Sequence, residues 1–517
     1  MPFASSRFAR FSSPSGRGWR GDALALLAGA LLPLAFAPFN LFPLAVVSPA
    51  LLFALWLNVP PRRALWRGWL FGLGMFGIGV TWIFVSIYEF GGGIGLPMSV
   101  FFTGLFVLVL SCFPALFGYL ATRLYPAAPR IRLLVVFPAA WTFFEWVRGW
   151  FLTGFPWLNL GYSQIDAPLA GLAPVVGVYG VSWATAFSAG LLLAAVLDGG
   201  GLWQRARYII ALLVLWITAG LLGMQHWTQA SGAPLKASLI QGNFSQDVKW
   251  TPEALEPTVR RYVELTRKHW DSKLIIWPET AMPLFYHEAT SFFDELAREA
   301  RANNADLLLG VPYMNMRSQQ YYNSMMSLGR HQAFYHKHHL VPFTEYLPLK
   351  TALAGVIDFL QVPMSDFSKG AAIQKPLEVA GQKAGISICY EAVFGEELIR
   401  QLPAATLLVN VSNDAWFGGS IGPHQHLQIT RMRALETGRP LLRATNTGIT
   451  AIIGPDGQFL ARAPQFEPHV LTAMVQPMSG ATPYVQVGNG PVVVLLVLGL
   501  VAGFFVVRKE CRSSGLI

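Results

Sequence analysis

The chain has 517 residues, of which 53% are hydrophobic and only 13% are charged, and its formal net charge is +10. Soluble domains carry roughly a quarter of charged residues, so this composition excludes a purely soluble protein and indicates a membrane part joined to a water-soluble part. The basic residues lie beside apolar segments and not in one patch, which argues against nucleic acid as a partner.

Seven predominantly apolar segments precede Gln225, and an eighth lies near the C-terminus. A helix that spans a bilayer needs about 20 mostly apolar residues. The segments cover residues 23–39, 42–58, 68–88, 95–122, 131–150, 168–197, 206–224 and 490–507. We therefore predict a transmembrane bundle of about eight helices, with a seven-helix membrane domain over 1–225 and a final helix and tail over 488–517.

Lysine and arginine alternate between the connections of these segments. They gather at the N-terminus, in three connections and after the last segment, whereas "EFGGGIGLP" and "FLTGFPWLNLGYSQIDAP" contain none. Because positive residues remain on the cytoplasmic side, this alternation predicts that both termini are cytoplasmic. The polar part of the chain, 226–487, is then expected on the outer side of the membrane.

Within 226–487 the pattern changes to short apolar runs that alternate with amphipathic stretches. The predicted strands are "LKASLIQGN", "SKLIIWPET", "ADLLLGVPY", "KAGISICYE" and "ATLLVNVSN". The predicted helices are "PEALEPTVRRYVELTRKHW", "ATSFFDELAREARANN" and "HQHLQITRMRALETGR", and "ITAIIGPDGQFLARA" is a predicted hairpin. Strands that alternate with helices predict an α/β domain whose helices cover the sheet.

The ends of the predicted strands carry polar side chains. Glu279 follows "LIIWP", and Cys389 and Glu391 follow "GISI". Since sites in open α/β sheets gather at the carboxyl ends of strands, we expect these side chains to share one edge. A further polar segment, "HKHHLVPFTEYLP", contributes Lys337 and Glu345.

Cys389 is one of only three cysteines. The predicted topology makes it the only cysteine on the outer side of the membrane, so it has no disulfide partner there. One interpretation is an inert cysteine that packs as a small apolar side chain. The other is a nucleophile, which needs a neighbouring base and a cation. Glu279 can take the thiol proton and Lys337 can hold a developing oxyanion, and their presence favours the nucleophile.

Five histidines raise the question of a metal centre: His336, His338, His339, His424 and His426. Imidazoles at close spacing bind zinc. Apart from Glu279 and Cys389, which are already assigned to the nucleophilic site with Lys337, no carboxylate or thiol completes a convincing ligand set. We therefore favour hydrogen-bonding histidines and predict neither a metal nor a cofactor.

The segments "LIIWPET", "HKHHLVPFTEYLP" and "GISICYE" resemble the Glu-Lys-Cys triad of the nitrilase superfamily of carbon–nitrogen hydrolases. The whole arrangement resembles the family of bacterial apolipoprotein N-acyltransferases. The resemblance implies a nitrilase-like αββα sandwich for 226–487, with Glu279 as general base, Lys337 as oxyanion-stabilising lysine and Cys389 as acylated nucleophile. It also implies supporting or substrate-binding residues, which are Glu345, Trp250, Tyr390 and Glu391. Thr344 stands where the motif leads us to expect a glycine.

The reaction that the resemblance implies is a ping-pong acyl transfer through a cysteine thioester. The expected donor is a membrane phospholipid, in the first place phosphatidylethanolamine. The expected acceptor is the N-terminal diacylglyceryl-cysteine of apolipoproteins, so the reaction is the final step of lipoprotein maturation. The implied location is the bacterial inner membrane, with the catalytic domain in the periplasm, and the lack of a heptad pattern favours a monomer.

Two alternatives stay open on the sequence. A membrane-tethered amidase or nitrilase shares the triad but hydrolyses a carbon–nitrogen bond, with water as the acyl acceptor. A transporter needs ionisable residues inside its spans, whereas these spans are nearly uncharged. The apolar segment "PFTEYLPLKTALAGVIDFLQVPM", residues 342–364, is expected to line an acyl pocket, to act as a lid or to pack as ordinary core.

Overall fold

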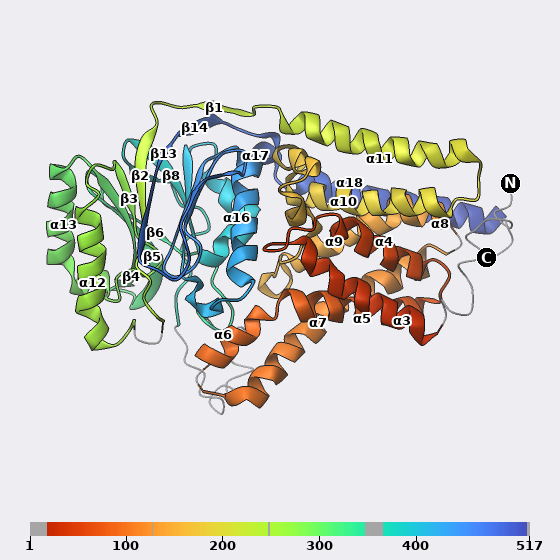
Figure 1. Cartoon of the computed structure of the whole chain (residues 1–517), viewed down its shortest axis with the longest axis horizontal. Helices are drawn as coiled ribbons and strands as arrows, with labels where there is room; N and C mark the ends of the chain where they lie inside the picture. The colour runs from red at the N-terminus through yellow and green to blue at the C-terminus, as the bar shows by residue number, and fades with distance from the viewer. Residues whose placement is uncertain (1–17, 92, 127, 247–248, 347–365, 514–517) are drawn as a thin grey trace. The chain divides into compact units, whose positions relative to one another are not determined.

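The computed structural model describes residues 18–91, 93–126, 128–246, 249–346 and 366–513 (Figure 1). The chain divides into two compact units. The helical unit comprises Met1–Phe84, Leu96–Gln225 and Val487–Ile517. The sheet unit comprises Val85–Gly95 and His226–Gln486.

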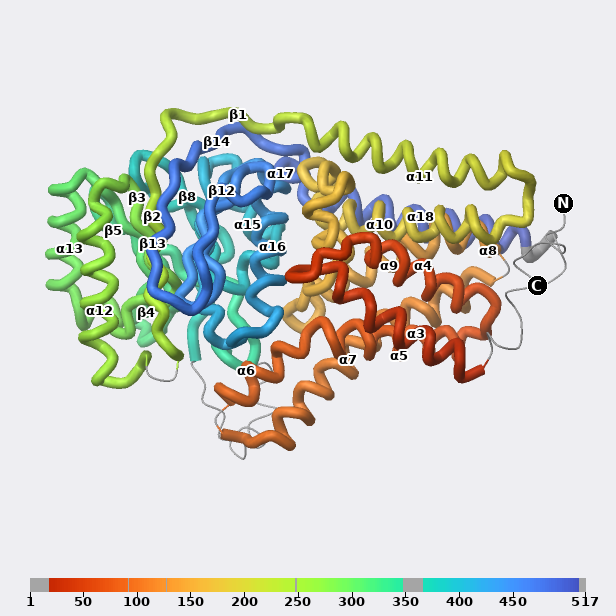
Figure 2. Tube along the Cα trace, in the orientation of Figure 1, coloured from red at the N-terminus to blue at the C-terminus, as the bar shows by residue number. Residues whose placement is uncertain are grey.

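The helical unit consists of apolar helices that run alongside one another (Figure 2). Its longer helices are α3 (Trp19–Leu31), α4 (Leu44–Trp56), α5 (Pro61–Gly79), α7 (Gly95–Leu124), α9 (Phe137–Arg148), α10 (Ala173–Leu197), α11 (Leu202–Gly223) and α18 (Gly490–Ser513). Helix α10 packs against α4, α9 and α11, and α18 packs against α9.

The described residues contain four helices that are long and apolar enough to cross a membrane: Gly95–Leu124, Pro168–Leu197, Leu202–Gly223 and Gly490–Glu510. The number becomes five if Pro61–Gly79 and α6 (Trp82–Phe90) form one broken span. The prediction of about eight spans is therefore not confirmed. Helix α4, for example, has 13 residues, and at 1.5 Å per residue it is about 20 Å long, short of the roughly 30 Å hydrocarbon core.

Glycines bring α3 and α5 into close contact. A Cβ atom at Gly29 would lie 2.0 Å from the Phe71 carbonyl oxygen, so the two helices pack backbone to backbone at this point. Asp22 of α3 also accepts hydrogen bonds from Arg63 and Arg67 of α5, at 2.5 and 3.1 Å. Small residues and an ion pair thus join these short helices.

The sheet unit contains two six-stranded sheets, together with a two-stranded sheet of β1 (Thr228–Ala230) and β14 (Met478–Gly480). The first has the order β13 (His469–Val475), β2 (Leu235–Gln241), β3 (Leu274–Ile276), β4 (Asp306–Asn315), β5 (Gln320–Leu328) and β6 (Ala333–His336). The second has the order β12 (Phe459–Arg462), β11 (Ala451–Ile453), β10 (Leu441–Thr445), β9 (Leu407–Ser412), β8 (Gln382–Ile388) and β7 (Leu377–Val379). Strands β2, β3 and β4 are parallel, as are β8, β9 and β10.

Buried apolar clusters define four layers in the sheet unit. Ile276 of the first sheet and Ile386 of the second lie in the core between the sheets. Ile275 faces the other way, as alternation along a strand requires, and packs in a cluster with Phe293 of α13 (Thr290–Ala302). Leu427 of α16 (Gly422–Thr437) covers the second sheet. Figure 1 shows α13 and α12 (Pro252–Arg267) on one side of the sandwich and α16 on the other.

All five predicted strands are present as β2, β3, β4, β8 and β9, and the predicted helices are α12, α13 and α16. The predicted hairpin is β11 and β12. Seven further strands of the described residues, β1, β5, β6, β7, β10, β13 and β14, were not predicted. Several of them mix polar with apolar residues, as in "QYYNSMMSL" of β5 and "LLRAT" of β10, so an apolar run does not mark them.

Candidate active site

The three residues predicted as a triad come together in the sheet unit. Glu279 follows β3, Lys337 follows β6, and Cys389 follows β8 of the other sheet. The Lys337 Nζ atom lies 3.4 Å from Glu279 Oε1, and the charges of both residues act on the Cys389 thiol. Packing of the two sheets thus places a carboxylate, an ammonium and a thiol side by side.

Two further side chains complete the surroundings of Lys337. Both Glu345 carboxylate oxygens are within 2.9 Å of Lys337 Nζ. The Asn323 amide on β5 donates to Glu279 at 2.8 Å and to Glu345 at 3.0 Å. The Val341 backbone N–H donates to Glu345 at 2.8 Å. Each carboxylate is therefore fixed by several donors, and the lysine lies between them.

The charges of this cluster set the protonation of the lysine and the cysteine. Burial alone would lower the pKa of Lys337, but the carboxylates of Glu345 and Glu279 raise it above the ordinary value, so the side chain is an ammonium. Burial and the Glu279 charge raise the pKa of the Cys389 thiol to about 12, against the opposite effect of Lys337. The resting cysteine is therefore a neutral thiol that needs a base.

Glu391 is buried and joins the segments that carry the thiol and the lysine. Its Oε1 accepts from the backbone N–H of His338 at 2.6 Å. Its Oε2 accepts from the Ile388 N–H at 2.8 Å and from the Tyr335 hydroxyl at 3.1 Å. Burial raises the pKa of Glu391 to about 7 although these N–H groups oppose the shift. Because Ile388 precedes the thiol and His338 follows the lysine, one carboxylate holds both segments in register.

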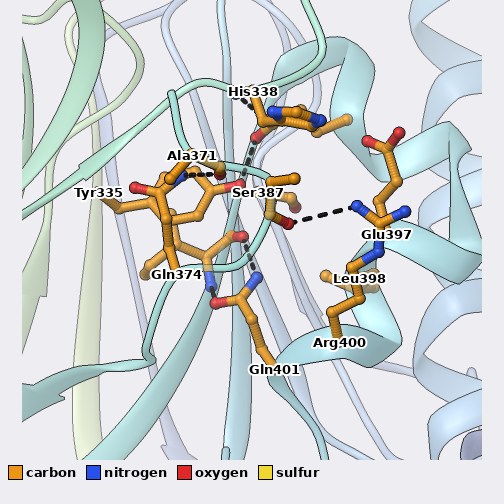
Figure 3. Close-up of a pocket in the computed structure, with 12 residues that line it drawn as sticks. Tyr335, His338, Ala371, Gln374, Ser387, Glu397, Leu398, Arg400 and Gln401 are labelled. Carbon is orange, nitrogen blue, oxygen red and sulfur yellow. Dashed lines mark hydrogen bonds between the residues drawn. The ribbon is translucent and has the colours of Figure 1, made fainter. Parts of the chain in front are cut away.

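A small cavity of about 20 Å³ lies beside Glu391 and is lined by polar groups of Tyr335, His338, Gln374 and Arg400 (Figure 3). A volume of this size admits about one water molecule and excludes a fatty acyl chain. The cavity therefore does not serve as the substrate pocket.

Two of the predicted supporting residues differ in exposure, since Tyr390 is half-buried and Trp250 is exposed. The Tyr390 ring packs edge to face with Phe394 and His339, at centroid distances of 5.1 and 5.6 Å. Trp250 is 52% exposed. It is the preceding residue, Lys249, that is buried.

Lys249 is a second buried lysine near the triad, and the sequence did not single it out. Its Nζ donates to the Thr280 hydroxyl at 2.9 Å, one residue after Glu279. Burial lowers the pKa of Lys249 to about 8, and the Glu279 carboxylate acts against this effect. Asn323 was also missed, because β5 was not predicted as a strand.

The neighbouring histidines form hydrogen bonds within the sheet unit. His336 Nδ1 lies 2.7 Å from the Ser324 hydroxyl, and His338 Nδ1 lies 2.8 Å from the Gly370 carbonyl. His339 Nδ1 lies 3.0 Å from Glu397 Oε1. Most of the predicted pocket or lid segment, namely residues 347–364 of the segment 342–364, lies outside the described residues.

Comparison with known proteins gives two family matches. The family described as apolipoprotein N-acyltransferase N-terminal domain matches residues 28–191, and the carbon-nitrogen hydrolase family matches residues 236–484. A carbon-nitrogen hydrolase from Helicobacter pylori G27, known from its crystal structure, shares 17% identity with a TM-score of 0.34, over 47% of this chain and 89% of that chain.

Closer similarity is found to two proteins named apolipoprotein N-acyltransferase. The protein from Methylococcus capsulatus is 50% identical over 493 residues, which is 95% of this chain and 97% of that relative. The protein from Nitrosomonas europaea is 47% identical over 473 residues, which is 90% of this chain and 94% of that relative. Identity of this extent over almost the whole chain establishes the family, and the chain therefore belongs to the apolipoprotein N-acyltransferases.

Proposed function

We propose that this membrane protein transfers a fatty acyl chain from a membrane phospholipid to the N-terminal diacylglyceryl-cysteine of apolipoproteins, through a thioester on Cys389. Membership of the family supports the activity. The observation that carries the mechanism is the buried contact of 3.4 Å between Glu279 and Lys337 beside a neutral thiol. We propose Glu279 as general base, Lys337 as oxyanion stabiliser and Cys389 as nucleophile.

In the first half-reaction, the Glu279 carboxylate takes the thiol proton while Sγ of Cys389 attacks the ester carbonyl carbon of the phospholipid. The Lys337 ammonium stabilises the oxyanion that forms. The carbon–oxygen bond then breaks, and Glu279 returns the proton to the leaving oxygen, so that a lysophospholipid departs. Glu345 and Asn323 keep the lysine and the base in place, and Glu391 keeps the thiol segment in place.

In the second half-reaction, the free α-amino group of the lipoprotein attacks the thioester carbonyl. Glu279 takes a proton from the attacking nitrogen, the carbon–sulfur bond breaks, and the thiol regains its proton. The acyl chain leaves as an amide. A site that admits little water favours the amine over hydrolysis of the thioester.

The location of both substrates in a bilayer suits the organisation that we propose for the chain. A membrane domain over 1–225 and a final helix over 488–517 would hold a periplasmic catalytic domain, 226–487, at the surface of the bacterial inner membrane. The alternation of basic connections supports cytoplasmic termini. Phosphatidylethanolamine as donor and a monomeric state are part of the same proposal.

The proposal is tested with a phospholipid that carries a labelled acyl chain. The wild-type chain should become labelled, and the label should leave with hydroxylamine, as a thioester does. Cys389→Ala should not become labelled. Cys112→Ala is the matched control, because Cys112 is an exposed cysteine on α7, and it should be labelled as the wild type is.

A chase with a diacylglyceryl-cysteine peptide distinguishes transfer from hydrolysis. The label should move to the peptide amine. Labelling of Cys389→Ala would overturn the nucleophile assignment, and release of free fatty acid at a rate independent of the peptide would favour a hydrolase.

A further inference from the structure

We propose that His426 is a positioning residue that fixes the backbone of the nucleophile by donating a hydrogen bond to the carbonyl group of Cys389. The inference rests on the proposed role of Cys389. His426 lies on α16, and its Nε2 atom is 3.1 Å from the Cys389 carbonyl oxygen. This histidine has no part in the triad, and sequence patterns alone gave it no function.

The backbone of Cys389 needs such a contact. Its φ angle is +52°, in the left-handed region that residues with a Cβ atom rarely adopt. A residue with a Cβ atom is strained in this region, and it persists there only where the surrounding structure over-determines its conformation. The direction of Sγ follows from this backbone conformation, so whatever holds the peptide group also aims the thiol.

The partners of the imidazole decide where its proton lies. A carbonyl oxygen only accepts, so Nε2 carries the hydrogen that faces Cys389. On the other side of the ring, Nδ1 lies 3.0 Å from Arg443 Nη2, which only donates, and 3.2 Å from Asp414 Oδ1, which only accepts. A neutral ring accepts from Arg443, and a protonated ring donates to Asp414. In both states Nε2–H stays on the Cys389 carbonyl.

Arg443 and Asp414 hold the ring rigidly. Arg443 Nη2 donates to Asp414 Oδ2 at 2.8 Å, and both side chains are fully buried. Arg443 also donates to Asn410 on β9 and to Thr430 on α16. The arginine of β10 therefore joins β9 to the helix that carries His426. Burial and the Arg443 charge lower the pKa of His426, which favours the neutral ring.

The same network reaches the thiol from the other side. The Ser412 hydroxyl donates to Asp414 Oδ1 at 2.7 Å, and the Asp414 charge and the Ser412 hydroxyl both act on the pKa of the Cys389 thiol. The carbonyl and the thiol of one residue are thus both connected to Asp414. We infer that this arrangement keeps the nucleophile aimed during both half-reactions.

Two variants of His426 separate positioning from simple stability. In His426→Gln the amide nitrogen of glutamine is separated from Cβ by the same number of bonds as Nε2 of the histidine. It therefore reaches the Cys389 carbonyl. In His426→Asn the amide reaches only as far as Nδ1, so it keeps the contact with Arg443 and loses the contact with Cys389. Single-turnover labelling by phospholipid should be about 10- to 100-fold slower in His426→Asn, and within about threefold of the wild type in His426→Gln.

The control is His424→Asn on the same helix, which should acylate like the wild type. All rates are measured well below the thermal midpoint of each variant, together with the rate of Cys389 alkylation by iodoacetamide. Equal rates for His426→Asn and His426→Gln, whether fast or slow, would overturn the positioning role. If the two His426 variants react at equal rates and Cys389→Ala is not labelled, the positioning role fails and the proposed function stands. If Cys389→Ala is labelled, the proposed function itself fails.

Discussion

Glu345→Gln tests how the ammonium of Lys337 is held. The wild-type carboxylate lies within 2.9 Å of Lys337 Nζ and also accepts from the Asn323 amide. The variant keeps the size of the side chain and one oxygen for the Val341 N–H. It removes the negative charge, and its amide nitrogen, which is itself a donor, must face another donor. After this change Glu279, at 3.4 Å, is the remaining carboxylate in contact with the lysine in the described part of the chain.

The distances give the size of the effect. With an effective dielectric constant of about 20, unit charges 2.9 Å apart attract by about 6 kcal/mol. At 3.4 Å the attraction is about 5 kcal/mol, so roughly half of the attraction on Lys337 is lost. Removing one partner of a buried pair costs about 3–5 kcal/mol, and the remaining carboxylate reduces that loss. We expect the ammonium to shift toward Glu279, which hinders both the proposed base and the proposed oxyanion contact.

The assay is single-turnover labelling of the detergent-solubilised chain by a phospholipid with a labelled acyl chain. Misplacing one oxyanion donor should slow acyl-enzyme formation by about 10²-fold. The pKa of Lys337, which the carboxylates hold above its ordinary value, should also fall, so activity should be lost at a lower alkaline pH than in the wild type. Glu378→Gln, which changes a 58% exposed carboxylate, is the matched control. A wild-type rate and an unchanged alkaline limit in Glu345→Gln would refute the reasoning.

Two further predictions concern the thiol and the loop of the base. Glu279→Gln removes a charge that raises the pKa of Cys389, so alkylation by iodoacetamide should set in about 1–2 pH units lower, although acyl transfer is lost. Lys337→Met removes the opposing charge and should slow alkylation at pH 10; shifts in the same direction would contradict the proposed electrostatics. Gly310→Ala should slow acylation at least about 10-fold, because its Cβ would lie 2.4 Å from the Pro278 carbonyl oxygen and displace the segment that carries Glu279. The control is Gly419→Ala, because a Cβ atom at Gly419 would have no other atom within 4 Å, and this variant should acylate normally.

Much of the catalytic architecture follows from the sequence by itself, because it depends on local patterns. Continuous apolar runs that end in polar residues predict β3 and β8, and with them the positions of Glu279 and Cys389. Amphipathic periodicity predicts α12, α13 and α16. The motif around Lys337 also brings Glu345, eight residues further on, within 2.9 Å of the amine. These features need only the chain near each residue.

Other features depend on contacts between distant segments, and only the tertiary structure decides them. The segments predicted at 23–39 and 42–58 are apolar enough for a membrane, yet they form the short helices α3 and α4. A glycine and ion pairs join α3 to α5. Asn323, Lys249 and His426 acquire their positions because separate strands and a helix pack around the thiol. The left-handed backbone of Cys389 likewise has no local signal. A single strand end does not fix such a conformation, and the hydrogen bond to the Cys389 carbonyl comes from His426, which lies 37 residues further along the chain.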